Sequence, residues 1–129
     1  MDTGGNAGSQ SSTLVIRGIA VGELKLRDAL TVLAKELRVS LLVGGGLAIV
    51  NFAYKYAMSG DLLLSIIVGI SLFGTVIFAQ TVGGMLPLLA KSLGFDPALM
   101  ASPIVTTIVD AGSLTMYFAV ASRVMNIAV

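Results

Sequence analysis

The chain has 129 residues, of which 56% are hydrophobic and only 12% are charged, and its mean hydropathy is +0.96. Because ordinary soluble domains carry roughly 25% charged residues, this composition indicates an integral membrane protein without room for a sizeable soluble unit. The net charge of +1 argues against a nucleic-acid-binding surface, and the lack of Cys and His excludes disulfides, thiolate chemistry and soft metal sites.

The first predicted element, residues 1–22, is a partial helix rich in Gly, Ser and Thr. It is too short and too polar to cross a membrane alone, and it reads as the end of a helix whose beginning is missing. Small polar residues recur in it at four-residue spacing, flanked by two amides: Gly5, Ser9 and Thr13, with Asn6 and Gln10 alongside. Helical geometry places this repeat on one face.

Residues 23–37 are predicted to form an interfacial linker helix, because leucines recur at helical spacing among charged residues at Leu26, Leu30, Leu33 and Leu37. Five of the eight basic residues lie between residues 17 and 38. Since basic loops face the cytoplasm, segment 17–38 is expected inside. Alternation of spans then puts the turn 91–96 inside as well and the C-terminus outside.

Stretches free of charge predict three full transmembrane helices, at residues 38–56, 62–90 and 97–123. The second is long enough to require tilt or a kink near Pro87, and the third carries Pro103 about one turn from its start, where a kink is expected. The predicted fold class is therefore all-α: a polytopic helical membrane bundle with three full spans and a partial N-terminal helix.

Asp110 is an isolated carboxylate at the middle of the third span. Inserting such a charge costs roughly 2.5–3.5 kcal/mol, so the side chain is expected to face a bundle interior, a water-filled path or an ion. Ser102 and Thr106 precede it at four-residue spacing and share its helical face, whereas Ile104, Val105 and Ile108 lie opposite. Two polar stripes, one with a carboxylate, are typical of the walls of an ion path.

Other roles for Asp110 stay open at this point. It could be a structural residue that hydrogen-bonds within the bundle, or the proton site of a proton-coupled membrane carrier. The chain could also be a non-transporting membrane anchor or assembly subunit held by its Gly contacts. An enzyme is not predicted, because the sequence offers no nucleophile–base pair, His or metal-ligand cluster.

Three motifs together resemble the transmembrane domain of the MgtE magnesium transport family. They are the segments at residues 3–17 (TGGNAGSQSSTLVIR), 83–91 (GGMLPLLAK) and 96–110 (DPALMASPIVTTIVD). The resemblance implies a domain of five helices that forms a homodimer in the plasma (inner) membrane and conducts Mg²⁺ between protomers. Residues 1–22 would be the C-terminal half of its second helix, and the three spans its third, fourth and fifth. The first helix and the cytoplasmic regulatory domains have no counterpart here, so the chain is expected to be a fragment.

The same resemblance assigns roles to single residues. Asp110 matches the pore carboxylate that binds the ion. Five further positions match pore-lining residues: Gly5, Ser9, Thr13, Ser102 and Thr106. Mg²⁺ prefers oxygen ligands and loses its waters reluctantly, so carboxylates and small hydroxyls can hold it through its hydration shell. Mg²⁺ is thus expected as the transported ion, with the lipid bilayer and a second protomer as the partners.

Overall fold

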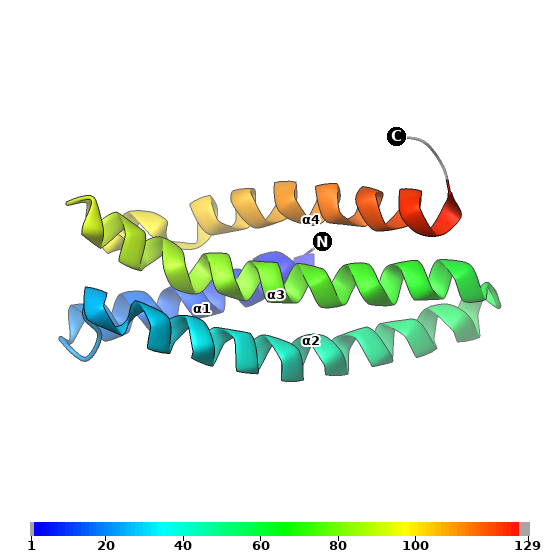
Figure 1. The fold of residues 1–129 in the computed structure, drawn as a ribbon, viewed down its shortest axis with the longest axis horizontal. Coiled ribbons are helices and arrows are strands. Elements are labelled where there is room, and N and C mark those ends of the chain that lie inside the picture. Colours follow the sequence, from blue (N-terminus) through cyan, green and yellow to red (C-terminus); the bar gives the residue numbers. More distant parts are fainter. Residues whose placement is uncertain (1, 127–129) are drawn as a thin grey trace.

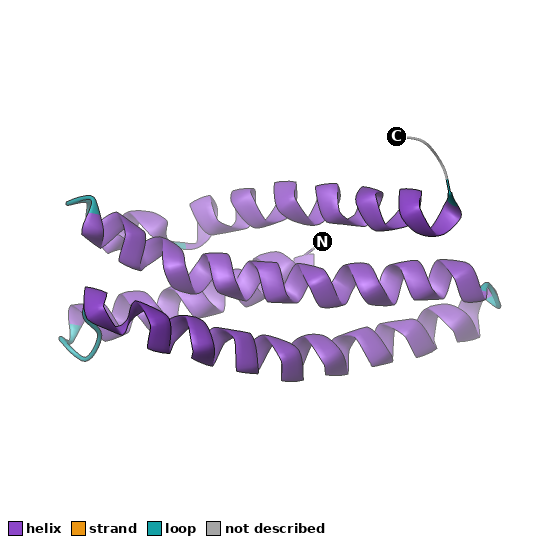
Figure 2. Ribbon diagram, in the orientation of Figure 1, coloured by secondary structure: helices purple, strands orange, loops and turns teal. Residues whose placement is uncertain are grey.

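The computed structural model describes residues 2–126 and is built from helices alone, with no strand in that range (Figure 2). The predicted all-α class is therefore confirmed. The elements in chain order are α1 (Asp2–Ala20), the 3-10 turn η1 (Leu26–Asp28), α2 (Ala29–Ser59), α3 (Leu62–Ser92), the 3-10 turn η2 (Pro97–Met100) and α4 (Ser102–Met125). The helices run side by side as a bundle (Figure 1).

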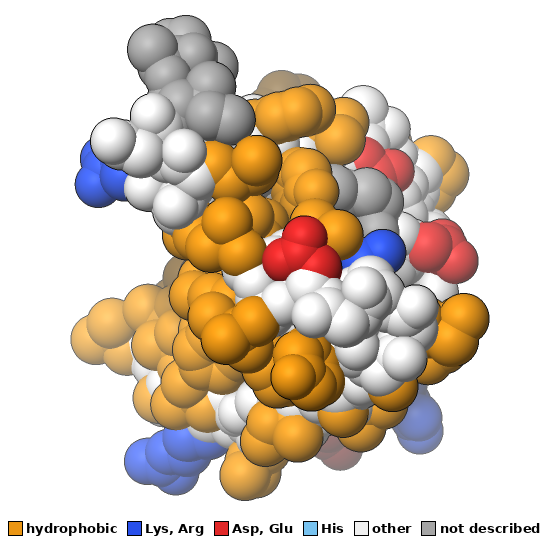
Figure 3. Space-filling model, turned by 90° about the vertical axis from the view of Figure 1, so that its right-hand side faces the viewer, with side chains coloured by type: hydrophobic (Ala, Val, Ile, Leu, Met, Phe, Trp, Pro, Cys, Tyr) orange, Lys and Arg blue, Asp and Glu red, His pale blue; other side chains and the backbone are white. Residues whose placement is uncertain are grey.

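Three helical segments are long and apolar enough to cross a membrane: Leu26–Ser59, Leu62–Ser92 and Ser102–Met125. The exterior is correspondingly apolar. Figure 3, which views the bundle from the end where α2 and α3 join, shows hydrophobic side chains over much of this face, with acidic and basic groups at its centre and around its edge. These observations confirm a membrane protein with three candidate spans.

Helix α2 combines the residues expected as a linker helix and those expected as the first span. It is continuous from Ala29 to Ser59 because proline is absent from the segment and the glycines 44–46 sit within the helical ladder. The leucines at positions 26, 30 and 37 point outward, and Leu30 is 79% exposed. The buried face of α2 is a different stripe at four-residue spacing: Val32, Glu36, Ser40 and Gly44.

Helices α2 and α3 form an antiparallel hairpin with a short turn. Gly60 closes α2 with a φ of 66°, a left-handed conformation that favours glycine. Asp61 then begins α3, since its carboxylate accepts a hydrogen bond from the Leu64 amide at 3.0 Å. Along the pair, Gly44 lies against Val76, and Glu36 lies against Gly84. This regular register holds α2 and α3 together over their length.

Helix α1 lies against α3 and α4 and begins near the middle of the bundle (Figure 1). Its glycines make the close approach possible. A Cβ on Gly8 would stand 3.0 Å from the Ala79 carbonyl oxygen, and a Cβ on Gly83 would overlap the Gly8 backbone itself. The apolar core beside this contact consists of Ala7, Val76, Ala79, Val105 and Val109.

The two membrane prolines behave differently from one another. Helix α3 continues through Pro87, which is buried. Helix α4 starts at Ser102, so Pro103 occupies its first turn, where no intrahelical hydrogen bond is lost. The kink expected at Pro103 is therefore wrong. The chain instead breaks just before it, at Ala101, which is extended with a ψ of 177°.

Candidate functional site

The polar residues singled out in the sequence lie where α1 and α4 pack antiparallel. Ser9 Oγ and Ser102 Oγ are 3.0 Å apart and share a hydrogen bond. One turn away, Gly5 leaves room for α4: a Cβ there would stand 3.3 Å from Thr106 Cγ2 and 3.7 Å from Asp110 Oδ1. We call the set Gly5, Ser9, Thr13, Ser102, Thr106 and Asp110 the polar face. Five of these residues meet across the α1–α4 contact.

The two threonine hydroxyl groups of the polar face donate hydrogen bonds to carbonyl groups of their own helices. Thr13 Oγ1 donates to the Ser9 carbonyl at 2.8 Å, and Thr106 Oγ1 donates to the Ser102 carbonyl at 2.8 Å. Because a hydroxyl oxygen keeps acceptor capacity when it donates, both oxygens can still accept from water or face a cation. Thr13 lies one turn beyond the Ser9 contact, toward the end of α1, and is exposed.

The carboxylate of Asp110 is half-buried at the edge of the contact between α1 and α4. Within residues 2–126 it has neither an ion pair nor a side-chain hydrogen bond, so both oxygens are free to accept. On the neighbouring positions of α4, Val105 and Val109 are fully buried in the core, whereas Ile108 is 38% exposed. Asp110 thus sits on the border between the packed interior and the outer surface.

Polar side chains also lie on α1 beside the polar face. Asn6, Gln10 and Thr13 are all exposed, and they lie on the same side of α1 as Ser9. Hydrocarbon cannot hydrogen-bond with amides and hydroxyls, so this side of a membrane helix requires water or protein next to it. Asn6 and Gln10 thus make this side of α1 unsuited to contact with lipid.

Two features of the packing were not anticipated from the sequence: a hydrogen bond from α1 and the burial of an acidic side chain of α2. Ser12 Oγ donates to the Met100 carbonyl, which ties α1 to η2. Glu36 of α2 is only 5% exposed and lies against Gly84 of α3, although its position in a charged segment suggested a solvated linker. The signal that could have located it is the small-residue stripe of α2, since Glu36 stands four residues after Val32 and four before Ser40.

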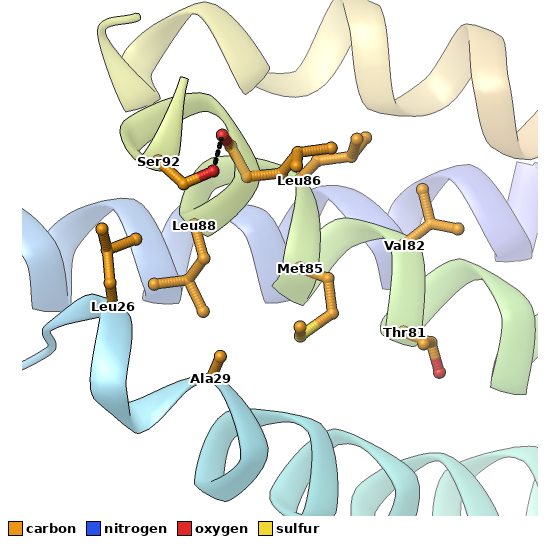
Figure 4. Close-up of a pocket in the computed structure, with 9 residues that line it drawn as sticks. Leu26, Ala29, Thr81, Val82, Met85, Leu86, Leu88 and Ser92 are labelled. Atoms are coloured by element: carbon orange, nitrogen blue, oxygen red, sulfur yellow. Dashed lines mark hydrogen bonds between the residues drawn. The ribbon is translucent and has the colours of Figure 1, made fainter. Parts of the chain in front are cut away.

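A separate pocket of about 510 Å³ opens between the start of α2 and the end of α3 (Figure 4). Its lining is mainly apolar: Leu26, Ala29, Thr81, Val82, Met85, Leu86, Leu88, Leu89 and Ser92. No residue of the polar face contributes to it. Among residues 2–126 no group of three or more His, Cys, Asp or Glu side chains could enclose a metal ion.

Comparison with known proteins gives a consistent result. A family described as MgtE, divalent cation transporter, matches residues 1–120. The chain is 46% identical over 126 residues to the magnesium transporter MgtE of Thermus thermophilus, which covers 98% of this chain and 28% of that protein. It is 32% identical over 122 residues to the magnesium transporter MgtE of Bacillus subtilis, covering 95% of this chain and 27% of that protein. The chain thus spans little more than a quarter of the length of these curated relatives.

Proposed function

Since the chain belongs to the MgtE family of divalent cation transporters, we propose that it carries Mg²⁺ across a membrane along the polar face, with Asp110 as the ion-binding carboxylate. The observation that carries the proposal is the meeting of Asp110 with Gly5 and Thr106, beside the hydrogen-bonded Ser9 and Ser102. A free carboxylate among small hydroxyls, on a side of the bundle unsuited to lipid, fits a hydrated cation path.

The chemistry of Mg²⁺ explains why this sparse set of ligands is enough. Mg²⁺ demands octahedral oxygen coordination at about 2.0–2.1 Å and gives up its waters reluctantly. A hydrated ion therefore offers outward-pointing water protons rather than empty coordination positions. Asp110 can accept from these waters with charge assistance, and the hydroxyl oxygens of Thr106 and Ser9 can accept further ones. Small side chains such as Gly5 leave space for the hydration shell.

A homodimer supplies the other wall of this path in the proposal. Asn6, Gln10 and Thr13 need polar surroundings, and a two-fold axis beside α1 and α4 would place the same face of a second copy opposite them. Two Asp110 carboxylates would then flank the ion. Their mutual repulsion is offset by the divalent charge between them.

The orientation follows from the distribution of basic residues. The segments around η1 and η2 lie at one end of the bundle, and the α2–α3 turn and the end of α4 lie at the other (Figure 1). We place the η1–η2 end in the cytoplasm of a cell with its transporter in the plasma membrane, because segment 17–38 holds most of the basic residues.

The test is Mg²⁺ flux through the intact protein in liposomes, read with an entrapped Mg²⁺ indicator, for wild type and Asp110→Asn. Asparagine keeps the size of the side chain but removes the charge. Hydrogen bonds to charged groups are worth about 1.5–3 kcal/mol, so we expect flux to fall roughly tenfold to a hundredfold.

Asp96→Asn is the matched control, because Asp96 is an exposed acid that caps the Ala98 amide outside the polar face. It makes the same chemical change and should leave flux unaltered. Wild-type flux in Asp110→Asn would sink the proposal. Proton uptake that an entrapped pH indicator records without Mg²⁺, and that an uncoupler abolishes, would instead point to a proton-coupled carrier.

A further inference from the structure

Glu36 is the one buried acidic side chain among the described residues, and the proposed ion path does not use it. It is 5% exposed, and the structure gives it no ion pair within residues 2–126. Burying an acidic group in a bundle costs free energy unless hydrogen bonds or an opposite charge compensate for the lost hydration. Its place in the fold therefore calls for a role.

Gly84 of α3 provides the space that Glu36 occupies. A Cβ on Gly84 would stand 2.8 Å from Glu36 Cγ and 3.4 Å from its carboxyl carbon, Cδ. The same Cβ would stand 3.0 Å from Ser11 Oγ of α1. The side chains of Glu36 and Ser11 thus share one space above Gly84. We call Glu36, Gly84 and Ser11 the back contact.

Polar groups lie on one side of the back contact, and the apolar cluster of Val15, Val32 and Leu88 lies on the other. Ser11 Oγ donates to the Gln80 carbonyl at 3.2 Å, and the Gln80 side-chain oxygen is buried without a partner. Ser40 lies one turn from Glu36 on α2, as Gln80 lies one turn from Gly84 on α3, so the antiparallel register brings Ser40 opposite Gln80. Glu36 therefore lies where a polar layer, on the side of Ser40 and Gln80, meets this apolar cluster.

The back contact lies on the opposite side of α1 from the polar face. Ser11 is two residues from Ser9 and two from Thr13, which is a rotation of about 200° about the helix axis. Any rotation of α1 that withdraws Ser11 from Gly84 also turns Ser9 away from Ser102. The contact of Ser11 with Gly84 thus fixes the rotation of α1 about its own axis, on the side opposite the polar face.

We propose that Glu36 is a positioning residue that, through Gly84 and Ser11, holds α1 in the rotation that presents Gly5 and Ser9 to α4. It does not touch the ion. Its effect on transport rests on the proposed function, whereas its effect on the rotation of α1 can be measured independently.

The experiment compares thiol labelling at two positions of α1 in the intact protein. The 129 residues of this chain contain no native Cys that would react as well. Thr13→Cys reports the exposed side, and Val15→Cys reports the buried side, where Val15 is 3% exposed. In wild type a water-soluble thiol reagent should label position 13 far faster than position 15. We expect Glu36→Ala and Gly84→Ala each to lower this labelling ratio roughly tenfold, in line with coupling between contacting residues.

Combining the two changes provides the decisive comparison. In Glu36→Ala/Gly84→Ala the added methyl group enters the space that the glutamate side chain leaves, so the labelling ratio should return toward that of wild type. Glu36→Gln keeps the shape and the hydrogen-bonding capacity, so it should preserve both the ratio and the Mg²⁺ flux. Gly46→Ala is the matched control, because a Cβ at Gly46 meets nothing within 4 Å.

Additive effects in the double variant would overturn the proposal, because they would mean that Glu36 and Gly84 are not in contact. Equally faster labelling at both positions would also overturn it, because it would indicate local unfolding. Loss of flux in Glu36→Gln with an unchanged ratio would also overturn it, because the charge would then act on the ion directly. If Asp110→Asn kept its flux while the ratios behaved as expected, the proposed function would fail and the positioning role would stand.

Discussion

Gly83→Ala tests how much the close approach of α1 and α3 contributes to the stability of the bundle. The new Cβ would stand 2.9 Å from the Gly8 Cα and closer still to the Gly8 carbonyl, whereas ordinary contacts are 3.4–4 Å. The atoms that it meets belong to the backbone, so no side-chain rotation can relieve the overlap. The two helices must move apart.

Overpacking of this kind costs about 1–3 kcal/mol and occasionally more, and a clash with backbone belongs at the upper end of that range. The matched control is Gly46→Ala on α2, where a Cβ meets open space. There the gain in helix propensity is up to about 1 kcal/mol. We therefore expect the two Gly→Ala variants to differ by about 4 kcal/mol in free energy of unfolding.

Unfolding in mixed micelles with increasing SDS, followed by helical circular dichroism, measures this difference. The same separation of α1 from its neighbours should break the 3.0 Å contact between Ser9 and Ser102. Equal stability of Gly83→Ala and Gly46→Ala would refute the reasoning, because it would mean that α1 does not pack on α3 through Gly8.

Three other outcomes are expected. Cysteines at Ser102 and Thr106 should react with a water-soluble thiol reagent in the membrane while one at Ile108 should not, and equal labelling would contradict a water-filled polar face. Changing Ser9 and Ser102 to Ala, singly and together, should reveal a coupling energy of about 0.6 kcal/mol in an SDS unfolding cycle; strictly additive losses would mean that the hydrogen bond between them contributes nothing. Asp61→Ala removes the cap of α3 and should cost about 0.5–2 kcal/mol, with Asp61→Asn as the conservative control, and an unchanged stability would show that the turn is held by Gly60 alone.

The spans were predictable because charges and hydropathy mark where a chain can enter hydrocarbon. Asp61 and Lys91 bound α3 closely, since both stand at its ends. The start of α2 was not predictable in this way. Lys35 and Arg38 come just before the charge-free stretch, yet both lie on the exposed side of α2, which begins at Ala29. The charges therefore limit the apolar stretch without limiting the helix.

The polar repeats at Gly5 and Ser9 and at Ser102 and Thr106 were visible because helical periodicity alone places them on single faces. The break before Pro103 was not, because it depends on local hydrogen bonds: Asp96 caps the Ala98 amide and holds η2 as a separate turn. The burial of Glu36 was hidden for another reason. The four-residue stripe of α2 marks its buried face, but the meeting of Glu36 with Gly84 depends on the register between α2 and α3, which the periodicity of neither helix encodes.

The order in which the chain is made gives the α1–α4 contact a further consequence. Ser9 and Ser102 are 93 positions apart, whereas α2 and α3 are joined by a short turn and can pair early. Helix α4 is the last of the four to leave the ribosome. The carboxylate of Asp110 therefore reaches Gly5 only after α2 and α3 have been made, and until then α1 has none of its contacts on α4. Chains in which α4 has not yet been made therefore lack the α1–α4 contact, whatever packing α2 and α3 have already reached.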